Sequence, residues 1–173
     1  MKSAWCLAAA LASLPSETGA EVLPTQVGPV EITPVAAGLE EPWAVAFLPD
    51  DAFLVTERGG RLLLGEGEAL RVVEGVPPAA VGGQGGLLDV MVPADFPTSR
   101  EVWLSFAVSV EDGAATAAGV GRLSEDGARL EDFLTVFTGD VYPGGRHFGA
   151  RLVEMPDGTV ALTTGDRATG PGG

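Results

Sequence analysis

The sequence contains very few of the residues that carry thiol and imidazole chemistry. It has one cysteine, Cys6, one histidine, His147, and no asparagine among its 173 residues. A chain with one cysteine cannot form an internal disulfide bond. Aromatic residues account for only 6% of the chain, whereas glycine and proline number 25 and 13. This composition is typical of a globular protein built from many short strands and turns.

Basic residues are also scarce. The chain has 10 lysines and arginines against 24 aspartates and glutamates, which gives a formal net charge of −14. Proteins that bind nucleic acids need clustered basic side chains to contact phosphates. Basic clusters also attract proteins to anionic membrane surfaces. The charge therefore argues against both kinds of partner.

The first 20 residues have the pattern of a secretory signal peptide. Lys2 provides a positive start, residues 4–14 are apolar, and small residues follow before Glu21. The apolar run is too short to cross a bilayer, so the mature protein is expected to have no membrane span. Cys6 lies inside this segment, which would leave the mature chain without thiol chemistry. We predict a signal peptide over residues 1–20 and a bacterial protein that is periplasmic or secreted. A genuine N-terminal helix is the alternative.

Short apolar runs separated by turn residues recur along the rest of the chain. The predicted strands cover residues 43–48, 52–56, 61–64, 70–73, 86–92, 101–106, 119–124, 133–137, 150–155 and 159–163. One or two further short strands are expected in residues 21–38, where three prolines favour an edge or a connecting segment. Residues 114–118 come nearest to a helix, but they are short and flanked by glycine, and we predict a loop there.

A strand–turn–strand unit repeats at the spacing of propeller blades. Its turn prolines, Pro49, Pro93 and Pro156, are roughly 44 and then 63 residues apart, and a four-stranded blade takes about 40–50 residues. A β-sandwich also has closely spaced strands, but the repeated unit favours an all-β propeller. Residues 21–173 are therefore predicted to form about two and a half to three blades of a propeller domain whose C-terminal part is missing. Open sheet edges would make such a piece poorly stable and prone to associate.

The single histidine lies where a glycine loop enters an apolar run. Gly144 and Gly145 precede His147 by a few residues, and Asp166 stands at the far end of the next apolar run. If the two runs form a hairpin, their outer ends lie side by side and Asp166 can orient the imidazole. Histidine titrates near neutral pH, which suits a general base. The alternative is a loop histidine that is satisfied by a backbone carbonyl.

Four stretches of the chain carry a resemblance to a known family. They are residues 38–50, 83–90, 121–124 and 145–153, and the most specific parts read Gly-Gln-Gly-Gly-Leu-Leu-Asp and Arg-His-Phe-Gly. In this order and spacing they resemble the N-terminal half of the soluble aldose sugar dehydrogenases of the glucose/sorbosone dehydrogenase family. Those proteins are six-bladed β-propellers that use pyrroloquinoline quinone (PQQ).

The resemblance implies a function and a set of site residues. The protein would oxidise aldose sugars to lactones, with His147 taking the proton of the anomeric hydroxyl while hydride passes from the same carbon to PQQ. Asp166 matches the aspartate that supports this histidine. Gln84 matches a glutamine of the cofactor and substrate pocket, with a turn glutamine in a flexible loop as the alternative. Arg146 is expected either to contact the cofactor carboxylates or to be a residue at the rim of the site. Neither the sugar nor the electron acceptor is specified by these motifs.

The resemblance also implies Ca²⁺, with ligands mainly beyond the end of the chain, and no metal-binding residue is predicted within it. The 173-residue piece alone is therefore expected to be inactive. Asp89, Arg151 and Arg167 are expected to be structural. Two alternatives are a secreted β-propeller that only binds a protein or glycan, and a calcium-dependent propeller hydrolase such as a lactonase. The absence of asparagine, a common calcium ligand, counts against the hydrolase.

Overall fold

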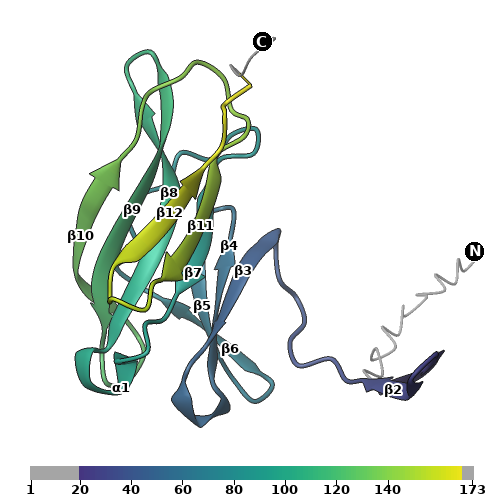
Figure 1. The fold of residues 1–173 in the computed structure, drawn as a ribbon. Coiled ribbons are helices and arrows are strands. Elements are labelled where there is room, and N and C mark those ends of the chain that lie inside the picture. The colour runs from purple at the N-terminus through teal and green to yellow at the C-terminus, as the bar shows by residue number, and fades with distance from the viewer. Residues whose placement is uncertain (1–19, 169–173) are drawn as a thin grey trace, which may run out of the picture. The chain divides into compact units, whose positions relative to one another are not determined.

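The computed structural model describes residues 20–168, whose regular secondary structure is almost entirely β-strand (Figure 1). The strands are β1 (Glu21–Thr25), β2 (Gly28–Ile32), β3 (Pro42–Phe47), β4 (Phe53–Glu57), β5 (Arg61–Glu66), β6 (Ala69–Val73), β7 (Leu87–Met91), β8 (Glu101–Val110), β9 (Gly113–Leu123), β10 (Leu130–Thr138), β11 (Gly149–Glu154) and β12 (Val160–Thr164). A 3-10 turn, η1 (Pro49–Asp51), and one helical turn, α1 (Phe96–Ser99), complete the described elements. No described helix has the length and apolar character needed to cross a membrane.

The chain divides into two compact units, one ending at Val35 and the other beginning at Ala36. In the first unit, β1 and β2 form an antiparallel hairpin in which Pro24 lies opposite Pro29. Proline has no backbone N–H to donate, so these positions suit a strand pair with free edges. The expected signal peptide lies outside the described residues, except for Ala20.

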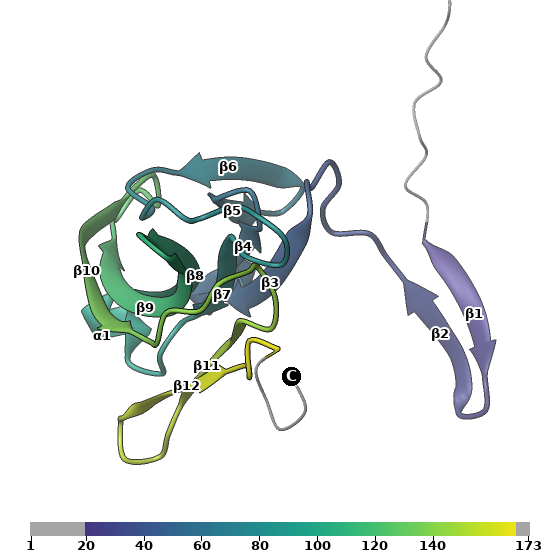
Figure 2. The ribbon, with the colours of Figure 1, turned by 90° about the horizontal axis from the view of Figure 1, so that it is seen from above.

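The second unit consists of successive antiparallel sheets. The first has the strand order β3-β4-β5-β6, the second contains β7, β8, β9 and β10 in chain order, and β11 and β12 begin a third. Viewed from above in Figure 2, the two four-stranded sheets and the β11–β12 hairpin follow one another as blades of a propeller. The predicted partial propeller is confirmed, with two complete blades and the start of a third.

The main hydrophobic core lies between the two four-stranded sheets. Leu54 and Leu62 of the first sheet and Leu104 and Phe106 of the second are almost completely buried there. Burying one such side chain stabilises the fold by about 1.5–3 kcal/mol. A second, smaller cluster contains Leu88, Ala107, Phe148 and Ala150, and it joins the second sheet to β11.

The prediction of a loop at residues 114–118 is wrong. These residues belong to β9, which pairs with β8 along its whole length around a two-residue turn at Glu111 and Asp112. Their small side chains are mostly buried, because the neighbouring strands and the third sheet approach closely. Ala115 and Ala117 have no exposed surface. The run of alanines has no alternation of polar and apolar residues, so the sequence pattern gives no sign of a strand.

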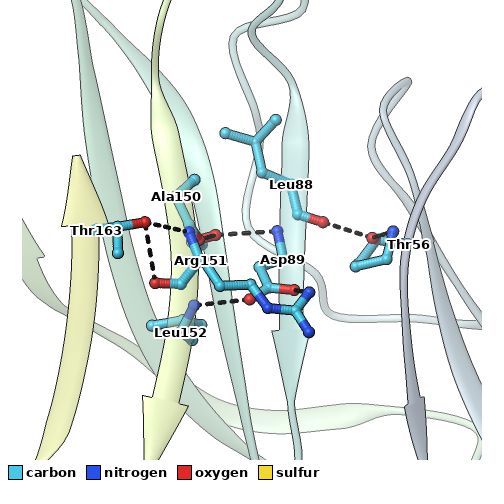
Figure 3. Close-up of polar contacts among 9 residues, drawn as sticks. Thr56, Leu88, Asp89, Ala150, Arg151, Leu152 and Thr163 are labelled. Atoms are coloured by element: carbon cyan, nitrogen blue, oxygen red, sulfur yellow. Dashed lines mark hydrogen bonds and ion pairs between the residues drawn. The ribbon is translucent and has the colours of Figure 1, made fainter. Parts of the chain in front are cut away.

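A threonine inside an apolar strand joins the first two blades. The Thr56 hydroxyl of β4 donates a hydrogen bond of 2.5 Å to the carbonyl of Leu88 in β7, as Figure 3 shows. The same hydroxyl accepts a bond of 3.1 Å from the Ala44 backbone N–H. Thr56 is fully buried, so its hydroxyl needs these partners.

A carboxylate and a serine join the second blade to β11, and Figure 3 shows the contacts of the carboxylate, Asp89. Asp89 accepts hydrogen bonds from the Leu152 backbone N–H at 2.7 Å and from the Arg151 guanidinium at 3.0 Å. The Ser105 hydroxyl donates to the Ala150 carbonyl at 2.6 Å and accepts from the Asp89 backbone N–H at 2.9 Å. No backbone ladder connects these two sheets, so side chains fix the position of β11.

Candidate active site

The two ends of the β11–β12 hairpin meet next to His147. Gly149 lies opposite Thr164 in the antiparallel register, and the Gly165 N–H donates to the Phe148 carbonyl at 3.2 Å. A Cβ atom at Gly165 would lie only 2.0 Å from the His147 carbonyl oxygen. Glycine is therefore required for this close approach. The hairpin predicted from the two apolar runs is confirmed.

The His147 imidazole and the Asp166 carboxylate form a hydrogen bond. The His147 Nδ1 atom lies 2.6 Å from the Asp166 Oδ1 atom. An ionised carboxylate can only accept, so Nδ1 carries the hydrogen and Nε2 keeps a free lone pair when the ring is neutral. The His147 side chain is 47% exposed, which leaves Nε2 open to a small molecule.

The charge state of Asp166 supports this arrangement. The hydrogen bond from His147 lowers the pKa of the Asp166 carboxyl below its ordinary value, and the Ala168 backbone N–H, which donates at 2.9 Å, adds to the effect. Asp166 is therefore ionised at neutral pH and acts as an acceptor for the imidazole.

Gln84 contacts the backbone of the histidine loop. Its backbone N–H donates to the Gly145 carbonyl at 2.7 Å, and its Oε1 atom accepts from the His147 backbone N–H at 2.8 Å. Gly83 has a φ of +58°, and a Cβ atom there would lie 2.4 Å from the Gly145 carbonyl oxygen. The loop that carries Gln84 therefore packs directly on the loop that carries His147. Because its Oε1 atom is bound to His147, the amide nitrogen is the part of the Gln84 side chain that remains to face a ligand.

Arg146, the residue before His147, is exposed. Its carbonyl accepts a hydrogen bond of 2.8 Å from Arg167 Nε, while none of the ion pairs among residues 20–168 involves its guanidinium. An exposed guanidinium is suited to bind an anionic group in bidentate fashion. The donor groups of Arg146 and Gln84 would suit a ligand that carries carboxylates and carbonyls.

The three residues expected to be structural all lie in polar networks. Asp89 is 4% exposed and Arg167 is 6% exposed, and each makes several hydrogen bonds. Arg151 pairs with Asp89, although its own side chain is 66% exposed. Sequence reasoning missed the contacts of Thr56 and Ser105. The one available signal was a small polar residue inside an otherwise apolar strand.

Across the described part of the chain, no three His, Cys, Asp or Glu residues gather in a group that could hold a metal ion. The nearest carboxylate to His147 is Asp166, and it is used as a hydrogen-bond acceptor for the imidazole.

The two blades and the β11–β12 hairpin are part of a β-propeller. The chain belongs to the glucose/sorbosone dehydrogenase family, whose model matches residues 39–172. It is 40% identical over 171 residues to the aldose sugar dehydrogenase YliI of Escherichia coli, a match that covers 96% of this chain and 43% of the relative.

Solved structures of sugar dehydrogenases are also similar to this chain. The apo form of the soluble aldose sugar dehydrogenase of Escherichia coli matches with a TM-score of 0.70 and 44% identity, over 75% of this chain and 39% of that chain. The PQQ-bound form of aldose sugar dehydrogenase from Streptomyces coelicolor matches with a TM-score of 0.65 and 26% identity, over 90% and 44% of the two chains. The chain thus spans about two fifths of the length of these relatives.

Proposed function

We propose that this chain supplies the catalytic base, and part of the cofactor pocket, of a PQQ-dependent aldose dehydrogenase that converts aldoses to lactones. The observation that carries the proposal is the His147–Asp166 pair, with Nδ1 hydrogen-bonded at 2.6 Å and the ring half exposed. Relatives named as aldose sugar dehydrogenases, one of them with PQQ bound, support it.

His147 Nε2 accepts the proton of the anomeric hydroxyl. Loss of this proton places negative charge on the oxygen, and the hydride then leaves the same carbon more easily. A positioned general base contributes about 10²–10⁴-fold to a rate. Asp166 keeps the imidazole in the tautomer that presents Nε2 as a base and stabilises the imidazolium that forms.

The cofactor-binding roles fall to Arg146 and Gln84. The exposed guanidinium of Arg146 pairs with a carboxylate of the cofactor. The Gln84 amide nitrogen donates a hydrogen bond to cofactor or sugar, while its oxygen stays on the His147 backbone. When bound, PQQ would accept the hydride that the sugar releases.

Several expectations from the sequence belong to the same proposal. This chain covers about two fifths of the length of these relatives, and we expect the Ca²⁺ ligands to lie mainly in the rest of such a protein. The 173 residues alone are accordingly expected to lack activity. A signal peptide over residues 1–20 and a periplasmic or secreted location also remain predictions.

Cofactor dependence tests the proposed function. The protein that carries this chain is stripped of cofactor, then assayed for aldose-driven reduction of an artificial dye with and without PQQ and Ca²⁺. We expect activity only when PQQ is present, and none from residues 21–173 alone. A protein that binds no PQQ and reduces no dye with any aldose would contradict the proposal and favour a propeller that only binds its ligand.

A further inference from the structure

Arg167 is a buried arginine that directly follows Asp166. Its side chain is 6% exposed, and its guanidinium carbon lies 3.8 Å from the centre of the Phe148 ring and 6.0 Å from that of Tyr142. Stacking on an aromatic face is a favourable environment for a desolvated guanidinium. The side chain is therefore packed on the ring of Phe148, the residue that follows His147.

The hydrogen bonds of this guanidinium go to backbone carbonyls of the segment just before His147 and of strand β9. Nε donates to the Arg146 carbonyl at 2.8 Å, and Nη2 donates to the Gly144 carbonyl at 3.4 Å. Nη1 donates to the Ala114 carbonyl at 3.2 Å, on strand β9. One side chain thus ties the segment just before His147 to the rigid second blade.

The loop needs such support because of its own conformation. Gly144 has a φ of +88°, and His147 itself has a φ of +52°, which is unusual for a residue with a side chain. The segment lies outside the strands, and Gln84 binds the His147 N–H and the Gly145 carbonyl. Arg167 binds the Gly144 and Arg146 carbonyls.

We propose that Arg167 is a positioning residue for His147, because its contacts with the Gly144 and Arg146 carbonyls fix the loop that presents the imidazole to Asp166 and to the sugar. This inference rests on the proposed function of His147 as the base. Lysine at this position would keep the charge but could not donate to three separate carbonyls from one rigid plane. Arg167→Lys is therefore the informative substitution.

The test measures both the rate and the geometry of the histidine. In the protein that carries this chain, Arg167→Lys is compared with Arg122→Lys, a matched control on the exposed side of β9 that pairs with Glu131. The first readout is kcat and KM for an aldose with PQQ. The second is the NMR signal of the hydrogen-bonded Nδ1–H of His147, identified by its absence in His147→Gln.

We expect Arg167→Lys to lower kcat by about 100-fold, the size of effect that a displacement of about 1 Å can cause, and to weaken or remove the Nδ1–H signal. KM should change by less than about three-fold, because the substrate contacts remain. Arg122→Lys should leave both readouts unchanged. A folded Arg167→Lys protein with normal kcat and a normal Nδ1–H signal would overturn the proposal.

The two measurements also distinguish an inactive wild-type protein from a failure of the Arg167 proposal, and a second variant covers the case in which Arg167→Lys does not fold. If the wild-type protein shows the Nδ1–H signal but no PQQ-dependent activity, the proposed function fails, while the signal still decides whether Arg167 positions His147. If Arg167→Lys does not fold, Phe148→Leu, which removes the ring beneath the guanidinium, takes its place. Unchanged kcat and an unchanged signal in that variant overturn the proposal, and a loss of both supports it.

Discussion

At the scale of single residues, His147 is held at its backbone and at its side chain. A non-glycine residue in the left-handed region costs roughly 1–3 kcal/mol, whereas one hydrogen bond contributes about 0.5–1.5 kcal/mol. The single bond from His147 N–H to Gln84 Oε1 is therefore too weak to maintain this conformation alone. The loop depends on several contacts together, which include those of Arg167 and Asp166.

The His147–Asp166 bond predicts a measurable change in the carboxylate. In His147→Gln, the pKa of the Asp166 carboxyl should rise toward its ordinary value of 3.8, because the imidazole is the largest cause of its depression. Part of the depression should remain, since the Ala168 N–H still donates. The measurement is a pH titration of the carboxyl carbon by NMR.

Asp157 is the control for that titration. Hydrogen bonds from the Thr159 side chain and backbone lower the pKa of its carboxyl, and it lies in the turn between β11 and β12, where His147 does not reach. Its pKa should be the same in wild type and variant. When folding lowers the pKa of a carboxyl, the ionised carboxylate stabilises the folded state at pH values above its ordinary pKa. This stabilisation is lost as the pH falls through the lowered pKa. The His147→Gln protein should therefore lose less stability than wild type below about pH 4. An Asp166 pKa that does not move would contradict the pairing.

At the scale of elements, the position of β11 depends on buried polar side chains. Asp89 and Ser105 supply the bonds that replace a backbone ladder between the second and third sheets. Burial raises the pKa of the Asp89 carboxyl, while the bonds from Leu152 N–H and Arg151 oppose that rise. Burial of the Asp89 carboxylate is thus unfavourable in itself, and its contribution lies in the hydrogen bonds that position β11.

Two substitutions separate these contributions. Asp89→Asn keeps an oxygen for the Leu152 N–H and loses only the pairing with the largely exposed Arg151, which should cost less than about 1 kcal/mol of unfolding free energy. Asp89→Ala leaves the Leu152 N–H buried without an acceptor and should cost about 1–3 kcal/mol. Urea unfolding measures both. If the two variants are equally destabilised, the ion pair rather than the backbone bond fixes β11.

The sequence was informative where partners are close along the chain. His147 and Asp166 are 19 residues apart, in one hairpin whose two apolar runs are visible, so their meeting was predictable. Gln84 and His147 are 63 residues apart, and their backbone contact arises only from the packing of consecutive blades. The resemblance identified Gln84 as a site residue, but nothing in the sequence indicated its bond to the His147 N–H.

The predicted boundaries of two strands were wrong for a different reason. β8 extends to Val110 and β9 begins at Gly113, well beyond the predicted runs. The missed part of β9, residues 113–118, is rich in alanine and glycine, which fit where sheets approach closely but give no periodic signal. The strong β-branched and leucine runs, such as residues 61–64 within β5, were placed correctly.

At the scale of the whole molecule, the described blades leave one sheet face uncovered. Trp43, Val45 and Phe47 of β3 are 47%, 49% and 74% exposed. They alternate along the strand and so share one face. In a closed propeller each blade packs against two neighbours, so this face is where another blade would pack. The sequence led us to expect that this piece associates with itself, and an exposed row of apolar side chains is a surface that promotes such association.

The central claim is that His147 is the base of a PQQ-dependent sugar oxidation. The most direct test compares wild type with His147→Ala in the protein that carries this chain, measuring PQQ binding and aldose-driven dye reduction side by side. We predict that the variant binds PQQ but that kcat falls by about 10²–10⁴-fold, the contribution of a positioned general base. A variant that binds PQQ and keeps kcat within a few-fold of wild type would contradict the claim and return His147 to a structural role.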